Sequence, residues 1–212
     1  MSISKPLLAL ALAAASFSAS AAVDLTTVQI TDGLFTPLAG ATTVTFDSVI
    51  PAGVSYTGGY IATGSVGSEY AAPPGDNTSY LTVGTSGYQT GPATATFSGA
   101  GATYFGFYLG SPDSYNSVTF KGSDGSSTTL TGDQLVSYIV PPINADGNQG
   151  NGFYFGVKST LGTTFTSVSF NSTSNAMETD NHAFILAVPE PETYAMLLAG
   201  LGLIGLVRRR KA

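Results

Sequence analysis

The sequence predicts an all-β protein: an antiparallel β-sandwich of jelly-roll-like type, with a signal helix before it and a short transmembrane helix after it. Apolar and polar residues alternate in short runs, such as Ser79–Val83 and Ser117–Phe120, and a period of two is typical of half-buried strands. Clusters of turn-forming residues separate these runs, in a chain with 26 glycines. Long apolar stretches without alternation occur near the two ends. Many short strands with frequent turns indicate an antiparallel sandwich.

Residues 1–22 have the pattern of a secretory signal peptide. Lys5 precedes an apolar run over residues 7–15, and small residues follow it. These are the basic, apolar and cleavage regions of a signal peptide in their usual order. We therefore expect the secretory translocon to export the chain and signal peptidase to cleave it after Ala21 or Ala22.

Residues 23–188 are long enough to form one domain with a sizeable core. Lys121 and Lys158 are their only basic residues, against eleven acidic ones, which gives this segment a net charge of −9. A surface this acidic repels phosphate backbones, so nucleic acid is not an expected partner. Cations and neutral glycans are easier partners, and solubility alone also explains the charge.

Cysteine and tryptophan are absent and histidine occurs once, which excludes several kinds of catalytic and binding site. Without cysteine, the chain has no disulfide, no thiolate catalysis and no sulfur-ligated metal. With His182 as its one histidine and no tryptophan, it has no multi-histidine metal site and no tryptophan platform for sugars. A hydrolase would need a nucleophile and an orienting acid around His182, and no serine stands in a nucleophile-elbow pattern.

The middle segment contains an internal repeat. Residues 104–120 align without gaps on residues 154–170, at an offset of 50 residues. Each copy consists of an aromatic strand, a turn and a second alternating strand, so we expect two similar hairpins that pair across the sandwich. Two copies are too few for a solenoid. One helical turn is expected over Asp133–Val136, after the N-cap-like Thr131.

Oxygen-rich clusters make calcium the favoured metal, because Ca²⁺ binds carboxylate and amide oxygens from loops. The predicted site combines Glu178, Asp180 and Asn181, joined by Asp47. A second cluster resembles the start of an EF-hand loop but lacks its twelfth-position glutamate, so an Asx-rich turn explains it more simply. Its members are Asn144, Asp146, Asn148 and Asn151.

A stretch of aromatic residues is a candidate for sugar binding. Adjacent strand positions face opposite sides, so one side of these strands is a candidate for stacking on glycans while the other fills the core. The residues are Tyr104, Phe105, Phe107, Tyr108, Phe153, Tyr154 and Phe155.

Two further classes of site stay open. A glycosidase needs two opposed carboxylates, which would have to converge in space. An ice- or mineral-binding surface would use rows of threonine and serine, such as Thr94 and Thr96, although these rows are short along the chain. The acidic candidates for the glycosidase are Asp47, Asp113, Glu178 and Asp180.

Residues 189–212 form a separate tail. Pro189, Glu190 and Pro191 precede the uncharged, mostly apolar run Tyr194–Val207, whose 14 residues would measure about 21 Å as a helix. A bilayer core is about 30 Å thick, so this run is short for a lasting anchor. The basic end of the chain should stay cytoplasmic because positive charge resists translocation. It consists of Arg208, Arg209, Arg210 and Lys211.

This order of elements resembles the PEP-CTERM sorting signal of Gram-negative bacteria. The resemblance covers about the last 24 residues. It implies recognition and cleavage by exosortase, a membrane-embedded transpeptidase, with a transient inner-membrane intermediate before release to the cell surface or the extracellular matrix. Proteins with this signal are often associated with exopolysaccharide or biofilm, and a similar tail also carries the family label of ice-binding protein C-termini.

The sequence therefore predicts an exported, non-enzymatic structural or polysaccharide-associated protein, with calcium as the one candidate cofactor. The alternatives are a secreted glycan-active hydrolase and an ice- or mineral-binding surface protein.

Overall fold

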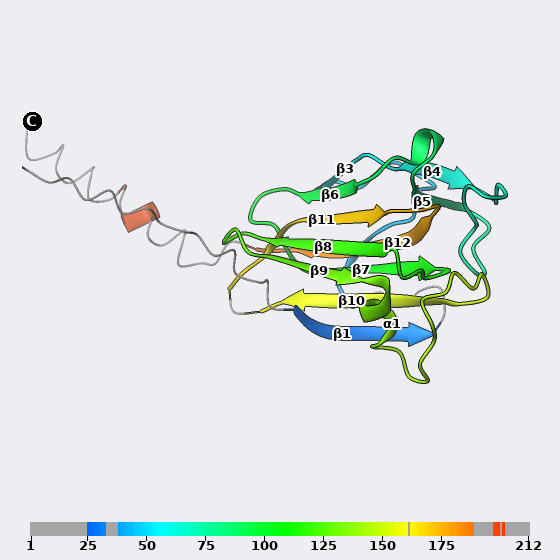
Figure 1. Cartoon of the computed structure of the whole chain (residues 1–212). Coiled ribbons are helices and arrows are strands. Elements are labelled where there is room, and N and C mark those ends of the chain that lie inside the picture. Colours follow the sequence, from blue (N-terminus) through cyan, green and yellow to red (C-terminus); the bar gives the residue numbers. More distant parts are fainter. Residues whose placement is uncertain (1–24, 33–37, 161, 189–196, 200, 202–212) are drawn as a thin grey trace, which may run out of the picture.

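The computed structural model describes residues 25–32, 38–160, 162–188, 197–199 and 201. Within these ranges twelve strands, one 3₁₀ turn and one short helix form, so the prediction of an antiparallel all-β fold is confirmed (Figure 1). The elements are β1 (Leu25–Asp32), β2 (Thr42–Val44), β3 (Val54–Thr57), β4 (Tyr60–Thr63), β5 (Ser79–Val83), η1 (Gly87–Gln89), β6 (Ala93–Phe97), β7 (Ala102–Gly110), β8 (Asn116–Gly122), β9 (Ser127–Thr131), α1 (Gly132–Val136), β10 (Gly152–Ser159), β11 (Phe165–Ser172) and β12 (Met177–Leu186).

The strands group into two antiparallel ladders. The first ladder has the order β3-β6-β11-β8-β9. The second has the order β1-β10-β7-β12, and both β5 and β2 pair with the far edge of β12, with β4 outside β5. The ladders join where Phe165 pairs with Ala102. The jelly-roll-like sandwich stays a prediction.

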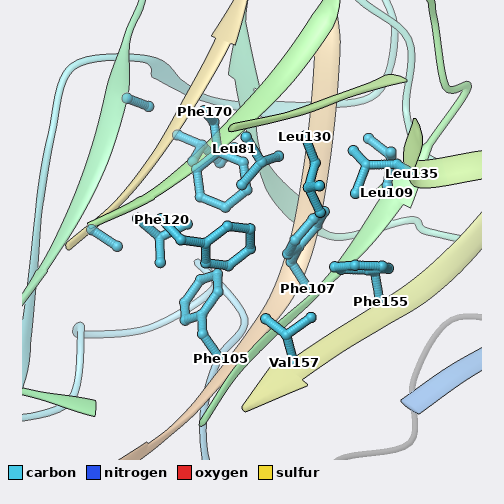
Figure 2. Close-up of a cluster of buried hydrophobic side chains, with 14 of the residues drawn as sticks. Leu81, Phe105, Phe107, Leu109, Phe120, Leu130, Leu135, Phe155, Val157 and Phe170 are labelled. Carbon is cyan, nitrogen blue, oxygen red and sulfur yellow. The ribbon is translucent and has the colours of Figure 1, made fainter. Parts of the chain in front are cut away.

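Phenylalanine side chains from both ladders meet in the main core (Figure 2). Phe170 of β11 packs edge-on against Phe107 of β7 at a centroid distance of 5.2 Å, and Phe97 of β6 packs against Phe105 at 5.6 Å. In β8 and β11 buried residues alternate with half-buried ones, as the period of two predicted. Such edge-on ring pairs are worth about 0.5–1.5 kcal/mol each beyond their buried area.

The opposite face of β7, β10 and β12 is also covered. Tyr104, Tyr108 and Tyr154 form a second buried cluster, against which Leu38 and Ala41 pack. Every aromatic residue of the predicted sugar-stacking stretch is at most 2% exposed. The prediction of an exposed aromatic face on these strands is therefore wrong, because a second layer of chain covers the side that the core leaves free.

The internal repeat folds differently from the predicted pair of hairpins. Strand β7 pairs with β10 and is centred on Gly106 opposite Gly156. Strand β8 pairs with β11 and is centred on Thr119 opposite Ser169. Each strand thus pairs with its own equivalent in the other copy rather than with the other strand of its own copy. The two copies are related by a pseudo-two-fold arrangement, and the hairpin prediction is wrong.

The short helix begins where the sequence predicts it. The Thr131 hydroxyl oxygen accepts a hydrogen bond from the Gln134 backbone at 3.3 Å, and the Gln134 side chain accepts one from the Thr131 backbone at 2.9 Å. This reciprocal capping box satisfies backbone groups at the helix start.

Both predicted targeting segments lie largely outside the described residues. The signal peptide over residues 1–22, the motif Pro189, Glu190 and Pro191, and the basic end over residues 208–211 are not described. In the predicted C-terminal transmembrane helix, residues 197–199 and 201 are helical. The part of the chain that the structure describes contains no helix that is long and apolar enough to cross a membrane, so it does not support that prediction.

Candidate functional site

A bulge in β12 sets the geometry of the candidate site. Asp180 pairs with Tyr108 and Ala183 pairs with Gly106, so Asn181 and His182 together oppose one residue of β7. Asn181 has a φ of 49°, in the left-handed region that asparagine tolerates better than most residues. Because the bulge adds one residue, it reverses the alternation of side chains along the strand.

The reversal turns His182 into the aromatic core. Its ring is fully buried and stacks on Phe170 at a centroid distance of 4.8 Å. Its Nδ1 lies 2.9 Å from the Tyr56 hydroxyl and its Nε2 lies 3.0 Å from the Thr179 hydroxyl. Burial lowers the pKa of His182 to about 3, which keeps the ring neutral. His182 is a hydrogen-bonded core residue.

Three acidic residues approach one another where the neighbour of β12 changes. Strand β2 pairs with residues 182–184 of β12, and β5 pairs with residues 177–179. Asp180 lies between these two paired segments, Asp47 follows β2, and Asp76 precedes β5. We call this region, with Asp47, Asp76 and Asp180, the β2–β5 junction.

Two carboxyl groups at the junction are buried and incompletely paired. Asp76 Oδ1 accepts hydrogen bonds from the Thr78 backbone at 2.8 Å and the Thr78 hydroxyl at 2.7 Å. Asp76 is 9% exposed and Asp180 is 2% exposed. Among the described residues, neither Asp76 Oδ2 nor Asp180 Oδ1 has a hydrogen-bond partner. Asp47 is exposed, and its Oδ1 accepts a hydrogen bond from the Ser79 backbone at 2.8 Å.

The electrostatics of the junction are unfavourable to a second negative charge. Burial, the charges of Asp76 and Asp47 and the side-chain contact with Asp76 together raise the pKa of Asp180 to about 8, and a hydrogen bond from the Asn181 backbone opposes them. The described chain contains no group of three or more acidic or histidine side chains arranged to hold a metal ion.

The structure places Glu178 in a neighbouring cavity rather than at the junction. Glu178 Oε1 accepts a hydrogen bond from the Ala71 backbone at 3.0 Å, and the residue is 3% exposed. Burial raises its pKa to about 7, with a further contribution from the charge of Asp113. Of the four residues in the predicted calcium cluster, Asp47 and Asp180 therefore lie at the junction, Asn181 forms the bulge beside it, and Glu178 faces another space.

That space is a polar cavity of about 410 Å³. Tyr70, Asp113, Tyr115, Asp146 and Glu178 contribute to its lining, so it is rich in carboxyl and hydroxyl groups. Burial raises the pKa of Asp113, although its hydrogen bond with Tyr115 lowers it. The cavity thus holds the buried Glu178 and the half-buried Asp113, which interact electrostatically.

The second predicted oxygen cluster is engaged with its own backbone. Asp146 Oδ1 accepts a hydrogen bond from the Asn148 backbone at 3.2 Å, and Asn148 Oδ1 accepts one from Gly150 at 2.9 Å. The Asn151 backbone donates to the Asn148 carbonyl at 2.9 Å. These contacts are those of Asx turns, the simpler of the two interpretations of Asn144, Asp146, Asn148 and Asn151.

The outer side of the first ladder carries rows of hydroxyl groups. Five residues pair in register across five strands, and all of them are exposed or half-buried. A second row runs beside the first and includes one charged residue. The first row is Thr57, Thr94, Ser169, Thr119 and Thr129, and the second is Ser55, Thr96, Ser167, Lys121 and Ser127. We call these ten residues the hydroxyl face.

Neighbouring hydroxyls of this face lie in hydrogen-bond contact. Thr94 and Ser169 hydroxyls are 2.9 Å apart, and those of Thr119 and Thr129 are 2.8 Å apart. The sequence suggested short rows along a strand, whereas the long rows run across strands. Only the strand order reveals them, because neighbouring strands lie about 4.8 Å apart and bring together residues that are distant in sequence.

The comparisons with known proteins identify the tail. Residues 187–211 match the PEP-CTERM protein-sorting motif. The chain thus carries the signal of exported proteins that exosortase processes and sorts to the cell surface. No curated protein matches the sequence significantly.

The domain bears a distant resemblance to a solved adhesin domain. The K2 cleaved adhesin domain of Lys-gingipain is 16% identical in sequence, covers 69% of this chain and 100% of its own, and has a TM-score of 0.44. A likeness at this level supports no inference about the site or the function.

Proposed function

We propose that the chain is a non-enzymatic protein of the cell surface or extracellular matrix that contacts neutral exopolysaccharide through the hydroxyl face. The observation that carries this proposal is the register of hydroxyl side chains across five strands. The PEP-CTERM signal would direct the chain to the cell surface. The chain would pass through a transient inner-membrane intermediate in a Gram-negative cell envelope. The ligand would lie on a broad polar surface and not in a deep pocket.

The chemistry of the hydroxyl face suits a polymer of uncharged sugars. Each serine or threonine hydroxyl donates one hydrogen bond and accepts others, as sugar hydroxyls also do. Lys121 is the one charged side chain among the ten residues of the face, so a neutral chain meets little unfavourable desolvation of charge. Aromatic stacking is not part of this proposal, because the aromatic strands are buried.

Two charge-introducing substitutions test the proposal. Thr96→Glu and Thr129→Glu place carboxylates on exposed positions of the hydroxyl face, and Thr42→Glu makes the same change on an exposed strand residue of the second ladder. We expect the full-length protein to be retained on the producing strain's exopolysaccharide, the two face variants to be lost from it, and Thr42→Glu to behave like the parent. Equal retention of all four proteins would contradict the proposed surface.

We also infer that the two ladders are the layers of a jelly-roll-like sandwich. This inference is supported by ring contacts between them, including Phe105 with Phe170 at 6.1 Å and Phe97 with Phe184 at 5.8 Å. In such a sandwich one layer would present the hydroxyl face outward while its alternate side chains fill the core.

A glycan-active hydrolase is the second candidate, favoured by the two acids of the polar cavity, the buried Glu178 and the half-buried Asp113. A glycosidase uses one protonated and one ionised carboxyl group, and Glu178, with a pKa of about 7, has the property of a general acid. Release of new reducing ends from exopolysaccharide that disappears in both Glu178→Gln and Asp113→Asn would establish this activity. No release by the parent protein would dismiss it.

Ice or mineral binding is the third candidate, because the same rows of hydroxyls would also match a repeating lattice. Thermal hysteresis that Thr96→Glu abolishes and Thr42→Glu leaves unchanged would favour ice. Absence of hysteresis in the parent protein would exclude it.

A further inference from the structure

We propose that the β2–β5 junction is a calcium site, with the carboxyl groups of Asp76 and Asp180 as its ligands and the exposed Asp47 contributing negative charge beside them. The sequence predicted Asp47 and Asp180 as members of a calcium site, whereas only the structure shows that Asp76 lies close to them. The proposal excludes Glu178, whose carboxyl group is hydrogen-bonded in the polar cavity.

Two buried carboxylate oxygens at the junction have no hydrogen-bond donor among the described residues. Buried polar atoms almost always have a partner, so each exception requires an explanation. Here two such atoms, Asp76 Oδ2 and Asp180 Oδ1, belong to neighbouring carboxyl groups that are both at least nine-tenths buried. A cation between these groups would satisfy both oxygens and offset the repulsion between the two charges.

Among the described residues, no basic side chain compensates the charge of these acids. The described lysines are Lys121 on β8 and Lys158 on β10, and both are exposed. His182, two residues from Asp180, is engaged by Tyr56 and Thr179 on the core side. The compensation for the buried acids would therefore come from a bound ion or from a shared proton.

The junction is built from three separate segments. Its acids come from the segment that follows β2, the turn before β5 and the bulge of β12, so an ion there would stabilise the contact of three segments. The turn before β5 already packs on the sheet, since the Tyr108 hydroxyl donates to the Pro74 carbonyl at 2.9 Å. Loops of this kind adapt to a large ion more readily than two paired strands do.

The donor set favours calcium over other metals. Carboxylate oxygens without thiolate or imidazole are typical of Ca²⁺ and Mg²⁺ sites. Calcium accepts six to eight oxygen ligands in irregular geometry, including backbone carbonyls and water, whereas magnesium requires a near-octahedral set. Since the described chain lacks a ready group of three acids around one point, water and backbone carbonyls would complete the shell.

The test measures binding and stability in the full-length protein purified in detergent. Titration with CaCl₂ in a calorimeter should give saturable heat, with Kd on the order of 10⁻⁴ to 10⁻³ M as in other extracellular modules. At a free calcium concentration about one hundred times Kd, the melting temperature should rise by about 5–10 °C relative to EDTA. The same titration with MgCl₂ should give a smaller shift.

Neutral isosteres identify the ligands. Asp180→Asn and Asp76→Asn should each weaken calcium binding by about tenfold or more, because fewer charged ligands remain. Asp47→Asn, at an exposed position that does not endanger folding, should weaken it less. Asp133→Asn removes an exposed acid in the first turn of α1, and this control should leave binding unchanged.

If the two carboxyl groups share a proton instead of a calcium ion, the expected results are the opposite. If one proton bridges Asp76 and Asp180, Asp180→Asn raises the melting temperature and calcium leaves the parent protein unaffected. Absence of both heat and a melting shift in the parent at calcium concentrations up to about one hundred times the expected Kd would overturn the proposal. Calcium binding that persists unchanged in Asp76→Asn, Asp180→Asn and Asp47→Asn would also overturn it, since the ion would then lie elsewhere.

Discussion

At the scale of single residues, the polar side chains of β12 have three different environments within a few positions. Glu178 faces the polar cavity, Asp180 faces the β2–β5 junction, and His182 is enclosed by aromatic rings. Each environment shifts the protonation balance toward the uncharged form because burial removes water from the group. The three side chains differ in their partners. Glu178 accepts a hydrogen bond from a backbone amide, Asp180 lies beside other acids, and His182 is hydrogen-bonded to two hydroxyl groups.

The core role of His182 can be measured by removing the ring. His182→Ala leaves a cavity among phenylalanines and takes hydrogen-bond partners from Tyr56 and Thr179. We expect the free energy of unfolding in urea to fall by about 3–5 kcal/mol. Thr42→Ala, at an exposed position, should stay within about 0.5 kcal/mol of the parent. A loss for His182→Ala as small as that control would contradict a core role.

At the scale of elements, one inserted residue decides which side chains of β12 reach the core. Without the bulge, strict alternation would place His182 on the same side as Asp180. The left-handed backbone at Asn181 accommodates the extra residue, so the position is constrained by conformation.

Substitutions at Asn181 test this constraint. Glycine adopts positive φ without strain, so Asn181→Gly should change the free energy of unfolding by less than about 0.5 kcal/mol. The β-branched Asn181→Val should cost about 1–2 kcal/mol, because valine is strained in that region. Thermal denaturation at fixed calcium measures both. Equal stability of the two variants would show that the backbone at the bulge can change its conformation, which would contradict a constraint at Asn181.

The strands themselves were predictable, but their partners were not. The alternating runs at Ser79–Val83 and Ala93–Phe97 coincide with β5 and β6. In β6 burial of one face imposes a period of two on the sequence, whereas in β5 every residue after Ser79 is buried. Pairing depends on contacts between distant segments, so local alternation gave hairpins where β7 pairs with β10. The helical turn after Thr131 was predictable because its capping residues are local.

The candidate site was predictable in part for the same reason. Asp180 and Asn181 are adjacent in sequence, and their oxygen-rich character was visible. Asp76 was missed because it stands in a proline- and glycine-rich turn far from β12, and nothing local indicates that the turn covers this strand. The sequence predicted Glu178 beside Asp180 because the two are two residues apart. In the structure the Glu178 side chain accepts a hydrogen bond from the Ala71 backbone and lines the polar cavity.

At the scale of the whole molecule, delivery and binding belong to different parts of the chain. The PEP-CTERM motif at residues 187–211 specifies export and surface sorting, and it follows directly after β12. The hydroxyl face and the β2–β5 junction belong to the strands that precede it. If the tail serves only in delivery, we expect it to be absent from the protein at the cell surface.

The central claim is that the tail is a processed sorting signal on an exported domain. The most direct test is intact-mass spectrometry of the protein recovered from the cell surface, combined with sequencing of its last peptide. We predict a C-terminus within or near Pro189–Pro191, with residues 194–212 missing. A surface protein whose C-terminus is still Ala212 would contradict the claim.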